Sequence, residues 1–369
     1  MILSPPKIFR YRLNHDLRSM IHHITTLVVT PERQQRLDLS KEQVKKILIV
    51  RATFRVGDSI LAIPAVKSFR KRFPEARIDF LGAPISAEIL KNLPIDNHFT
   101  ITRRYPGSGW HYPVLIRRLR SIRYDLAIDV SCSQSAMGSF LVGFSGARLR
   151  AGLKGKWDLW FNVKIGKQSE INKYKTLPNL LTGLGLELDS TMPLLPLSVT
   201  EIENGRSELR SLLNDEVEKD MGKPIAGVFV GGRKSWGKRW PLSNFCRVIS
   251  GLYREGVNVV LFIGPDEKDL SGDLRNSLDP HIPLIAEPSL RNFAAMVSNC
   301  DLFVTGDSGP MHLAYALGTR TVAIFLYPNF DRWGPPGVRI AYQSSGCSPE
   351  EVLRICREEL SRPVLARCG

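Results

Sequence analysis

The stretch Asp301–Phe325, DLFVTGDSGPMHLAYALGTRTVAIF, divides into strand, turn, helix, turn and strand. Leu302–Thr305 is a short apolar run rich in β-formers, and the GDSG sequence at 306–309 is dense turn chemistry. Pro310 suits the first helical position, and Gly318 suits the left-handed residue just past a helix end. These features predict half of a parallel α/β unit, whose turn lies at the sheet edge where such sheets bind ligands.

The same turn combines small residues with the backbone N–H groups of a helix N-terminus. That combination accepts an anion, and a phosphate most naturally. His312 lies in the first helical turn and could donate to the same anion. The alternative is a well-capped helix, with Asp307 or Ser308 as its N-cap and His312 on the surface. This segment alone leaves both interpretations open.

The composition sets broad limits on the class of protein. The 369 residues are enough for two ordinary domains, and 43% hydrophobic and 24% charged residues are typical of a globular protein. Six cysteines without a CxxC pair argue against a metal centre or a disulfide framework. A net charge of +15 favours an anionic partner, namely nucleic acid, anionic lipid or a phosphorylated substrate. A solvated basic surface without a specific partner is the alternative.

Residues 1–44 differ from the rest of the chain. Apolar residues recur there at helical spacing with basic residues between them, which predicts a basic amphipathic helix. It could lie on an anionic membrane surface or pack on the protein body, and we slightly favour packing. No apolar run of roughly 18 residues, enough to cross a bilayer, occurs. Without a clear signal core, we expect a cytoplasmic protein, with a peripheral place on the inner membrane face as the alternative.

The segments that follow alternate between strand and helix patterns. Lys46–Arg51 is an apolar strand, and the helical spacing after it contains Pro64. The helix is therefore either kinked at this proline or begins later than the spacing suggests. Arg77–Leu81 and Tyr124–Val130 are predicted strands, with a helix at Val114–Ile122 between them. This alternation predicts a parallel sheet with helices on its faces.

The second part of the chain repeats this alternation. Residues 148–175 are basic and rich in Trp and Gly without a regular period, and we expect loops over a cleft there. The charged run at 201–223 suggests a connection, after which Pro224–Val230 restarts the pattern with a strand. Helix Leu242–Arg254 and strand Val257–Ile263 follow. The simplest architecture is two successive α/β domains with a cleft between them.

Several common motifs are absent from the sequence, namely GxGxxG, GxxxxGK[ST], GxSxG and HExxH. Their absence argues against the usual nicotinamide enzymes, P-loop NTPases, hydrolases and zinc proteases. An acidic DxD motif is also absent. We therefore expect no metal site.

Three loops that follow strands carry polar residues suited to a binding site. Gly57 and Asp58 stand at a helix start, where a carboxylate is either an N-cap or a general base, and position alone favours the cap. In the second loop, Lys238 and Arg239 suit a diphosphate, and a solvated basic loop is the alternative. Glu267 in the third loop suits ribose hydroxyls, or is simply a carboxylate favoured by the helix dipole.

Taken together and in this order, these loops resemble glycosyltransferase family 9, the ADP-heptose:lipopolysaccharide heptosyltransferases. KILIVRATFRVGDSILAIPAVKSFRKRFPEARIDFL at 46–81 looks like the family's N-terminal strand, Gly-Asp turn and helix. KRWPLSNF at 238–245 and VVLFIGPDE at 259–267 look like its second-domain nucleotide loops. GDSGPMHLAYALGTRTVAIF at 306–325 looks like its D-[ST]-G-x-x-H-L-A-x-A-L-G signature. The joint order is more specific than any one segment.

The resemblance implies an α/β protein of GT-B architecture, with two Rossmann-like domains facing a central cleft. It implies an inverting, metal-independent glycosyltransferase that moves a sugar, typically heptose from ADP-heptose, onto a lipopolysaccharide core or related cell-surface glycan. The second domain would bind the nucleotide-sugar donor and the first an anionic lipid-linked saccharide, and no cofactor or nucleic-acid partner is expected. The expected boundaries are a basic extension at 1–44, an acceptor domain at 45–200, a linker at 201–223, a nucleotide-sugar domain at 224–345 and a helical tail at 346–369.

The family's functional residues carry over by position. Asp58 matches the proposed catalytic base. Lys238 matches the phosphate-contacting lysine, and Arg239 beside it is a further expected donor contact. Glu267 is the expected ribose or adenine contact, and Asp266 is the second candidate for this role. The residues that match the diphosphate-binding turn are Asp307, Ser308, Gly309 and His312.

The sequence also departs from the family pattern. TFRV at 53–56 replaces a commoner small Ser/Leu turn, so that a bulkier, charged residue borders the expected base. GGRK at 231–234 is unusually basic, and the central region matches no pattern that selects an acceptor. The donor sugar and the acceptor therefore stay open. The alternatives are a UDP-sugar-dependent transferase or nucleotide-sugar epimerase of the same architecture, and a non-catalytic binder of anionic lipid or polymer.

Overall fold

The computed structural model describes most of the chain after the N-terminal extension. The described residues are 37–102, 110–166, 170–188, 192–213, 223–232, 237, 239–286, 289–342, 344 and 347–363. The amphipathic helix expected within residues 1–44 lies outside this part of the chain, and so does Lys238. The fold therefore decides neither of these two predictions.

Two six-stranded parallel sheets form the framework. The first sheet has the order β3-β2-β1-β4-β5-β6 and the second has the order β12-β11-β10-β7-β8-β9. In each sheet the chain starts in the middle, runs to one edge and then crosses back, which is the doubly wound Rossmann order. The strands are β1 Lys46–Arg51, β2 Arg77–Gly82, β3 Asn97–Thr100, β4 Leu126–Asp129, β5 Leu149–Leu153, β6 Val163–Ile165, β7 Ile225–Phe229, β8 Asn258–Ile263, β9 Leu284–Ala286, β10 Leu302–Gly306, β11 Thr321–Ile324 and β12 Arg339–Ala341.

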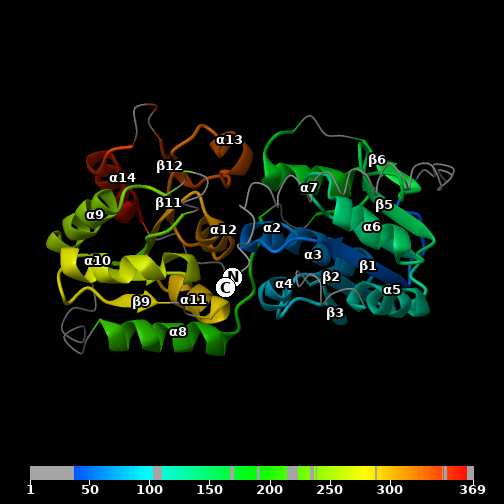
Figure 1. Ribbon diagram of the computed structural model, residues 1–369, viewed down its shortest axis with the longest axis horizontal. Coiled ribbons are helices and arrows are strands. Elements are labelled where there is room, and N and C mark those ends of the chain that lie inside the picture. Colours follow the sequence, from blue (N-terminus) through cyan, green and yellow to red (C-terminus); the bar gives the residue numbers. More distant parts are fainter. Residues whose placement is uncertain are drawn as a thin grey trace, which may run out of the picture.

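The sheets define two domains that lie side by side, with helices on the faces of each sheet (Figure 1). The short helices α2 and α12 pack against each other where the domains meet. The helices are α2 Val56–Ile60, α3 Ile63–Arg72, α4 Pro84–Ile89, α5 His111–Ile122, α6 Ala136–Phe144, α7 Lys173–Thr182, α8 Val199–Leu212, α9 Leu242–Arg254, the 3-10 helix η3 Pro265–Leu270, α10 Ser271–Ser277, α11 Leu290–Ser298, α12 Gly309–Ala316, α13 Phe330–Trp333 and α14 Pro349–Ser361.

Pro64 separates two helices after β1. Helix α2 ends at Ile60, and α3 begins at Ile63 with the proline in its first turn. A proline there lacks only an N–H that would have no partner within the helix. Of the two expectations for this segment, the later helix start is therefore correct, and the preceding turn becomes a separate short helix that carries Asp58.

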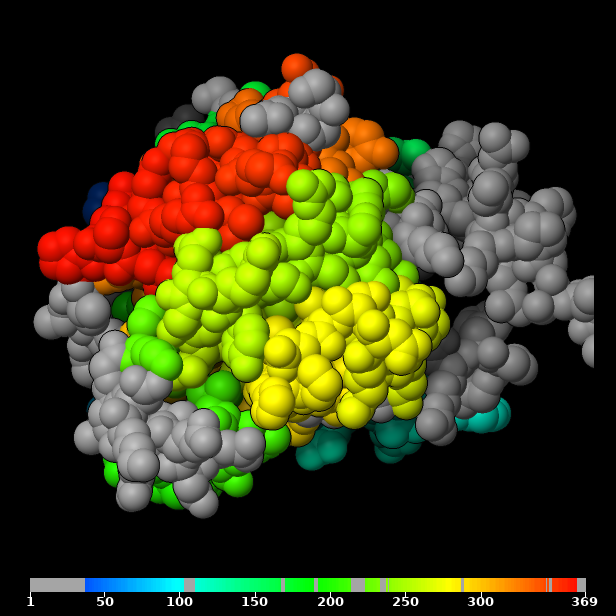
Figure 2. Space-filling model, turned by 90° about the vertical axis from the view of Figure 1, so that its left-hand side faces the viewer, coloured from blue at the N-terminus to red at the C-terminus, as the bar shows by residue number. Residues whose placement is uncertain are grey.

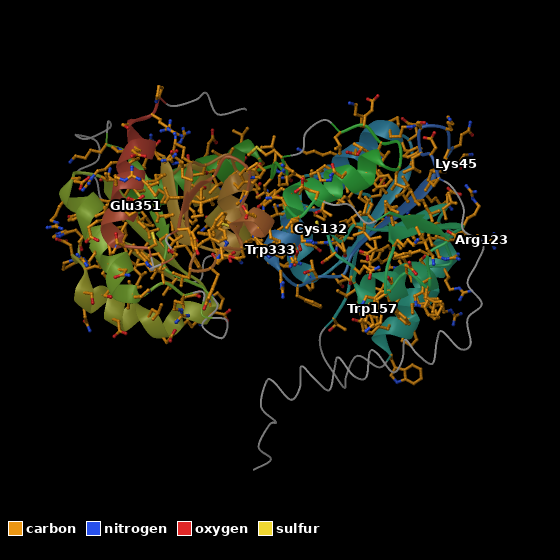
Figure 3. The ribbon with its side chains drawn as sticks, turned by 90° about the horizontal axis from the view of Figure 1, so that it is seen from above. Lys45, Arg123, Cys132, Trp157, Trp333 and Glu351 are labelled. Carbon is orange, nitrogen blue, oxygen red and sulfur yellow. The ribbon has the colours of Figure 1, made fainter. Side chains whose placement is uncertain are left out.

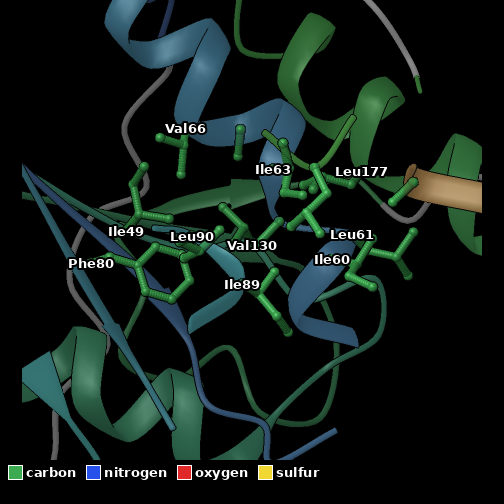
Figure 4. Packing of buried hydrophobic residues seen from close by; sticks show 14 of the residues in the cluster. Ile49, Ile60, Leu61, Ile63, Val66, Phe80, Ile89, Leu90, Val130 and Leu177 are labelled. Carbon is green, nitrogen blue, oxygen red and sulfur yellow. The ribbon is translucent and has the colours of Figure 1, made fainter. Parts of the chain in front are cut away.

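The central strands of the first sheet, such as β1 and β4, are buried on both faces, as expected for a parallel sheet covered by helices. Ile49 of β1 and Phe80 of β2 are fully buried and meet Ile63 and Val66 of α3 in a continuous apolar cluster (Figure 4). Leu48, the neighbour of Ile49 in β1, is buried in a separate cluster on the opposite face. The packing of α3 against β1 and β2 thus holds the segment that carries Asp58 at the end of β1.

The expectation of loops across 148–175 is wrong in part, because β5 and β6 lie there. Both strands are short, and the pattern of β5 is interrupted by Gly152. A side chain at this glycine would collide with Phe161, because an added Cβ would fall 2.2 Å from the Phe161 Cε2 atom. The Phe161 ring occupies the space of a side chain at position 152. The apolar residue that would have marked β5 in the sequence is therefore absent.

Helix α8 occupies much of the charged run that was expected as a linker, and it packs along α11 of the second domain. Ser198 and Glu201 form a capping box at its start. Gly205 lies at the crossing, because a Cβ there would fall 2.5 Å from the Ala295 carbonyl carbon. The exposed charged residues of α8 therefore lie on the outer face of a packed helix, namely Glu203, Arg206 and Arg210.

Glu201 also joins α8 to the second domain. Its carboxylate accepts hydrogen bonds from Arg291 Nε at 2.9 Å and Nη2 at 2.6 Å. Asn92 of the first domain donates to the same carboxylate at 3.1 Å. The hydrogen bonds from Arg291 hold the pKa of Glu201 well below its ordinary value.

Glu201→Gln is expected to lower the free energy of unfolding by about 1–2 kcal/mol, because hydrogen bonds to a charged group are lost. A lowered pKa in the folded state means that the carboxylate contributes stability above the ordinary glutamate pKa. This contribution is lost as the pH falls toward the lowered value. Denaturant titrations of wild type and variant at neutral and acidic pH test this, and an equal difference at both pH values would contradict it.

The outer face of the second domain is covered by α9, α10 and α14 (Figure 2). Helix α14, which lies in the expected helical tail, packs against α9 and against strands of the second sheet. Trp240 donates from Nε1 to the Cys347 carbonyl at 3.0 Å, which fixes the start of α9 to the segment before α14. Among the described residues, no helix has the length and apolar character needed to cross a membrane.

Candidate active site

A cavity of 790 Å³ lies between the two domains, at the carboxyl ends of both sheets. Parallel sheets bind ligands at such edges, next to the central strands from which the chain turns to either side. Loops after β1 form one wall, and loops after β7, β8 and β10 form the other. The expected site residues that line it are Gly57, Asp58, Asp266, Glu267, Asp307, Ser308, Gly309 and His312.

Asp58 is one of two acidic residues that the described part of the first domain contributes to the cavity, the other being Glu88 of α4. Asp58 lies within α2, where Arg55 occupies the N-cap position, so the interpretation of Asp58 as an N-cap is wrong. Its side chain is 15% exposed and accepts hydrogen bonds from Arg51 Nη2 at 2.9 Å and Thr53 Oγ1 at 3.3 Å. The carboxylate is thus held in one orientation while it borders the cavity.

Arg51 supports Asp58 from beneath. It is the last residue of β1 and is buried, and its guanidinium also donates to the carbonyls of Asp58 and Val130 at 3.0 and 3.1 Å. The nearby Asp129 is buried too, which raises its pKa to about 6. Arg51 was not predicted from the sequence. An arginine at the end of an otherwise apolar strand nevertheless indicates a buried charge, which needs a partner.

The turn after β10 forms part of the second wall. Ser308 occupies the N-cap position of α12, as one interpretation expected, but its side chain makes no capping hydrogen bond. Its hydroxyl lies 3.2 Å from Thr305 Oγ1 instead. Asp307 accepts from Asn329 Nδ2 at 3.1 Å. The start of α12 therefore borders the cavity without a side-chain cap, as an anion site at a helix N-terminus requires.

His312 follows in the first turn of α12. The interpretation that placed it on the surface is wrong, because only 8% of it is exposed. Its Nδ1 atom lies 2.5 Å from the hydroxyl of Tyr174, which belongs to the first domain. The ring also meets Trp333 edge-on at a centroid distance of 6.4 Å. In Figure 3, Trp333 marks the second domain's side of the boundary between the two domains, and Cys132 marks the first domain's side.

Glu267 lies in η3, which follows β8, and it contacts the loop that follows β7. It is buried, which raises the pKa of its carboxyl, and it accepts from the Gly232 N–H at 3.3 Å. Cβ atoms added to Gly231 and Gly264 would fall 2.9 Å from its Cδ and 3.1 Å from its Oε2, respectively. Both glycines therefore give this carboxyl the space to reach the cavity.

Arg239 does not line the cavity with the other expected residues. It donates to the carbonyls of Gly232 and Asp266 at 3.4 and 3.1 Å, and its Nη2 lies 3.6 Å from Glu267 Oε1. The guanidinium thus ties the two nucleotide loops together. Lys238, its neighbour, lies outside the described residues.

The chain is similar in sequence to a known protein family and to a named heptosyltransferase. Residues 114–359, more than half of the chain, match glycosyltransferase family 9 (heptosyltransferase). The chain is 24% identical over 310 residues to lipooligosaccharide heptosyltransferase 2 of Haemophilus ducreyi, which covers 79% of this chain and 86% of that protein.

Two solved structures share the fold. A family 9 glycosyltransferase from Veillonella parvula superimposes with a TM-score of 0.70 at 20% identity, covering 89% of this chain and 99% of that one. The E. coli heptosyltransferase WaaC with ADP does so with a TM-score of 0.66 at 17% identity, covering 85% and 99%. The expected GT-B architecture is confirmed, and the chain belongs to glycosyltransferase family 9 (heptosyltransferase).

Proposed function

We propose that this glycosyltransferase moves a heptose from ADP-heptose onto a lipopolysaccharide core or a related cell-surface glycan, with inversion at the anomeric carbon. The observation that carries the proposal is one cavity with Asp58 on one wall and the start of α12 and Glu267 on the other. The names of the H. ducreyi relative and of the E. coli protein with ADP support heptose and ADP.

Asp58 is the proposed general base. The acceptor hydroxyl oxygen attacks the anomeric carbon, and its proton passes to the Asp58 carboxylate. The bond from the anomeric carbon to the diphosphate oxygen breaks with its electron pair, so that nucleoside diphosphate leaves. Arg51 and Thr53 keep the carboxylate pointed at one place, which lowers the cost of aligning it with the hydroxyl.

The diphosphate is proposed to bind at the turn formed by Asp307, Ser308 and Gly309. Negative charge grows on its oxygen as the bond breaks, and the helix N-terminus of α12 offers N–H groups and a positive dipole end there. His312 in the same turn is a further donor to a phosphate oxygen. Lys238 supplies the cation in this proposal, and its chain neighbour Arg239 ties together the loops that follow β7 and β8.

Glu267 is proposed to accept from the ribose hydroxyls, with Asp266 beside it in η3, just after β8. Its place resembles that of the acidic residue that binds ribose in other Rossmann-type domains. The acceptor would bind against the first domain as an anionic lipid-linked saccharide, in keeping with the net charge of +15. A cytoplasmic enzyme in peripheral contact with the inner membrane surface fits such an acceptor.

A donor panel tests the proposal. We expect ADP to raise the melting temperature of the full-length protein more than UDP does, and ADP-heptose to support transfer to a heptose-free lipopolysaccharide core. Transfer from UDP-sugars alone would overturn the choice of donor, and isomerisation without transfer would overturn the reaction. The epimerase and the non-catalytic binder are not favoured, because the family match is to glycosyltransferases.

Lys238→Ala is expected to weaken ADP binding by about 1.5–3 kcal/mol, the contribution of a charge-assisted contact. Calorimetric titration with ADP measures this. Lys41→Ala is the matched control, because the Lys41 side chain is 82% exposed and pairs with Asp38, far along the chain from the nucleotide loops. Equal ADP affinity in both variants would remove Lys238 from the donor site.

A further inference from the structure

His312 is enclosed by residues of both domains. Tyr174 of α7 lies 2.5 Å from its Nδ1 atom, and the two rings stack with a centroid distance of 5.7 Å. On another side, a Cβ added to Gly57 of α2 would fall 2.3 Å from the His312 Cδ2 and 3.0 Å from its Nε2. The imidazole of the second domain thus fills a space whose walls are supplied largely by the first.

The direction of the hydrogen bond between Tyr174 and His312 follows from the surroundings of the phenol. Tyr174 is buried, and within the described residues its hydroxyl has His312 Nδ1 as its hydrogen-bond partner. If the hydroxyl accepted a hydrogen bond from Nδ1–H, its own O–H would be buried without an acceptor, at a cost of about 1–3 kcal/mol. The phenol therefore donates. Burial also raises the pKa of Tyr174 well above its ordinary value, so the proton stays on the oxygen.

The tautomer of His312 follows in turn. A neutral imidazole that accepts at Nδ1 carries its proton on Nε2. Nε2 belongs to the ring edge that faces Gly57, and both residues line the cavity that Asp58 borders. Nε2–H therefore lies on the side of the His312 ring where the two walls of the cavity meet.

Asn172 sets the position of Tyr174 by holding α7 to the second domain. Its side-chain oxygen caps α7 by accepting from the Tyr174 N–H at 2.9 Å. Its side-chain nitrogen donates to the carbonyls of Asp331 and Gly334, at 3.1 Å each, next to Trp333. One residue therefore both starts the helix that carries the phenol and fastens that start to α13, so the phenol reaches His312 when the domains are docked.

We propose that Tyr174 is a positioning residue that, across the domain boundary, holds His312 as the Nε2–H tautomer so that it donates to a phosphate oxygen of the donor. The phosphate part rests on the proposed function, whereas the tautomer does not. Loss of the phenol leaves Nδ1 without its donor, so both neutral tautomers become populated. Tyr174 reaches His312 only when the two domains are docked. Domain docking is therefore coupled to the tautomer of His312.

Tyr174→Phe tests this, because it removes one oxygen and keeps the ring that meets Tyr315 edge-on at 5.0 Å. The full-length protein is labelled with ¹⁵N-histidine, and long-range proton–nitrogen spectra report the tautomer of each of its 7 histidines. His312→Gln assigns the signal by its disappearance. We expect the Nε2–H pattern in wild type and a mixture in Tyr174→Phe. An unchanged pattern in Tyr174→Phe would overturn the inference.

Donor binding supplies the second measurement. We expect the ADP dissociation constant to rise about 2- to 10-fold in Tyr174→Phe, the range for one lost hydrogen bond. Tyr112→Phe is the matched control, since its hydroxyl donates to the Thr102 carbonyl away from the cavity lining, and its ADP affinity should equal that of wild type. A changed tautomer with unchanged ADP affinity would overturn the role toward phosphate. If wild type binds no ADP, the proposed function fails, and the spectra still decide the tautomer.

Discussion

Asp58→Asn is expected to reduce turnover by about 100- to 10,000-fold, the usual contribution of a general base. The amide retains the shape of the side chain and can still accept from Arg51, which donates at 2.9 Å to Asp58 Oδ1. It cannot take a proton from an acceptor hydroxyl. Donor binding should stay close to that of wild type, because the donor is proposed to contact the other wall of the cavity.

Turnover at saturating donor and calorimetric titration with ADP separate these two effects. Glu88→Gln is the control, because Glu88 also lines the cavity but is an exposed residue of α4, and we expect its turnover to be near that of wild type. The melting temperature of Asp58→Asn shows whether the buried Arg51 keeps its side-chain hydrogen-bond partner in the variant, because loss of this partner would lower the melting temperature. Near-normal turnover in Asp58→Asn would mean that the carboxylate only holds Arg51 in place.

Gly57→Ala is expected to reduce turnover roughly 100-fold, the cost of misplacing reacting groups by about 1 Å. The added methyl would fall 2.3 Å from the His312 Cδ2 and 2.8 Å from its Cγ, so the domains or the imidazole must move. Gly57 lies within α2, where alanine is the better helix former. Lost activity should therefore not be accompanied by lost helix stability.

Gly272→Ala is the matched control, because it also lies in a helix and a Cβ added there would have no atom within 4 Å. It should keep full turnover and gain about 0.5–1 kcal/mol of stability. Turnover of both variants, and small-angle scattering to detect any separation of the domains, test the comparison. Wild-type turnover in Gly57→Ala would show that the His312 contact is dispensable.

The sequence predicted the elements whose patterns are local. The strand Lys46–Arg51 and the helix Leu242–Arg254 were predicted with the bounds that the structure has, because apolar spacing marks them clearly. Strand β5 was missed because Gly152, which packs against Phe161, interrupts its pattern, and β6 was missed because it has only 3 residues. Pro64 indicated a break in helicity, and the packing of α3 decided where the break lies.

The candidate site was predictable only in part. Asp58 and Glu267 were singled out because each lies in a polar segment that follows a strand, and a turn at a sheet edge is visible in the sequence. Position alone favoured an N-cap for Asp58, and only the resemblance to the family favoured a general base. Arg51 and Tyr174 were missed, because their roles depend on partners that folding brings together. Tyr174 and His312 lie 138 positions apart, and no local pattern links them. Their relation appears only when α7 of one domain meets α12 of the other.

The identical strand order of the two sheets has a consequence for how the activity can diversify. Strands β1 and β7 hold equivalent central places, yet each bonds only to neighbours within its own sheet. Changes to the segment that leaves β1 therefore do not alter the pairing of strands beneath the nucleotide loops. Under the proposed division of the site, acceptor contacts can therefore change in the first domain without altering the nucleotide loops, provided that Gly57 and Tyr174, which contact His312, are kept.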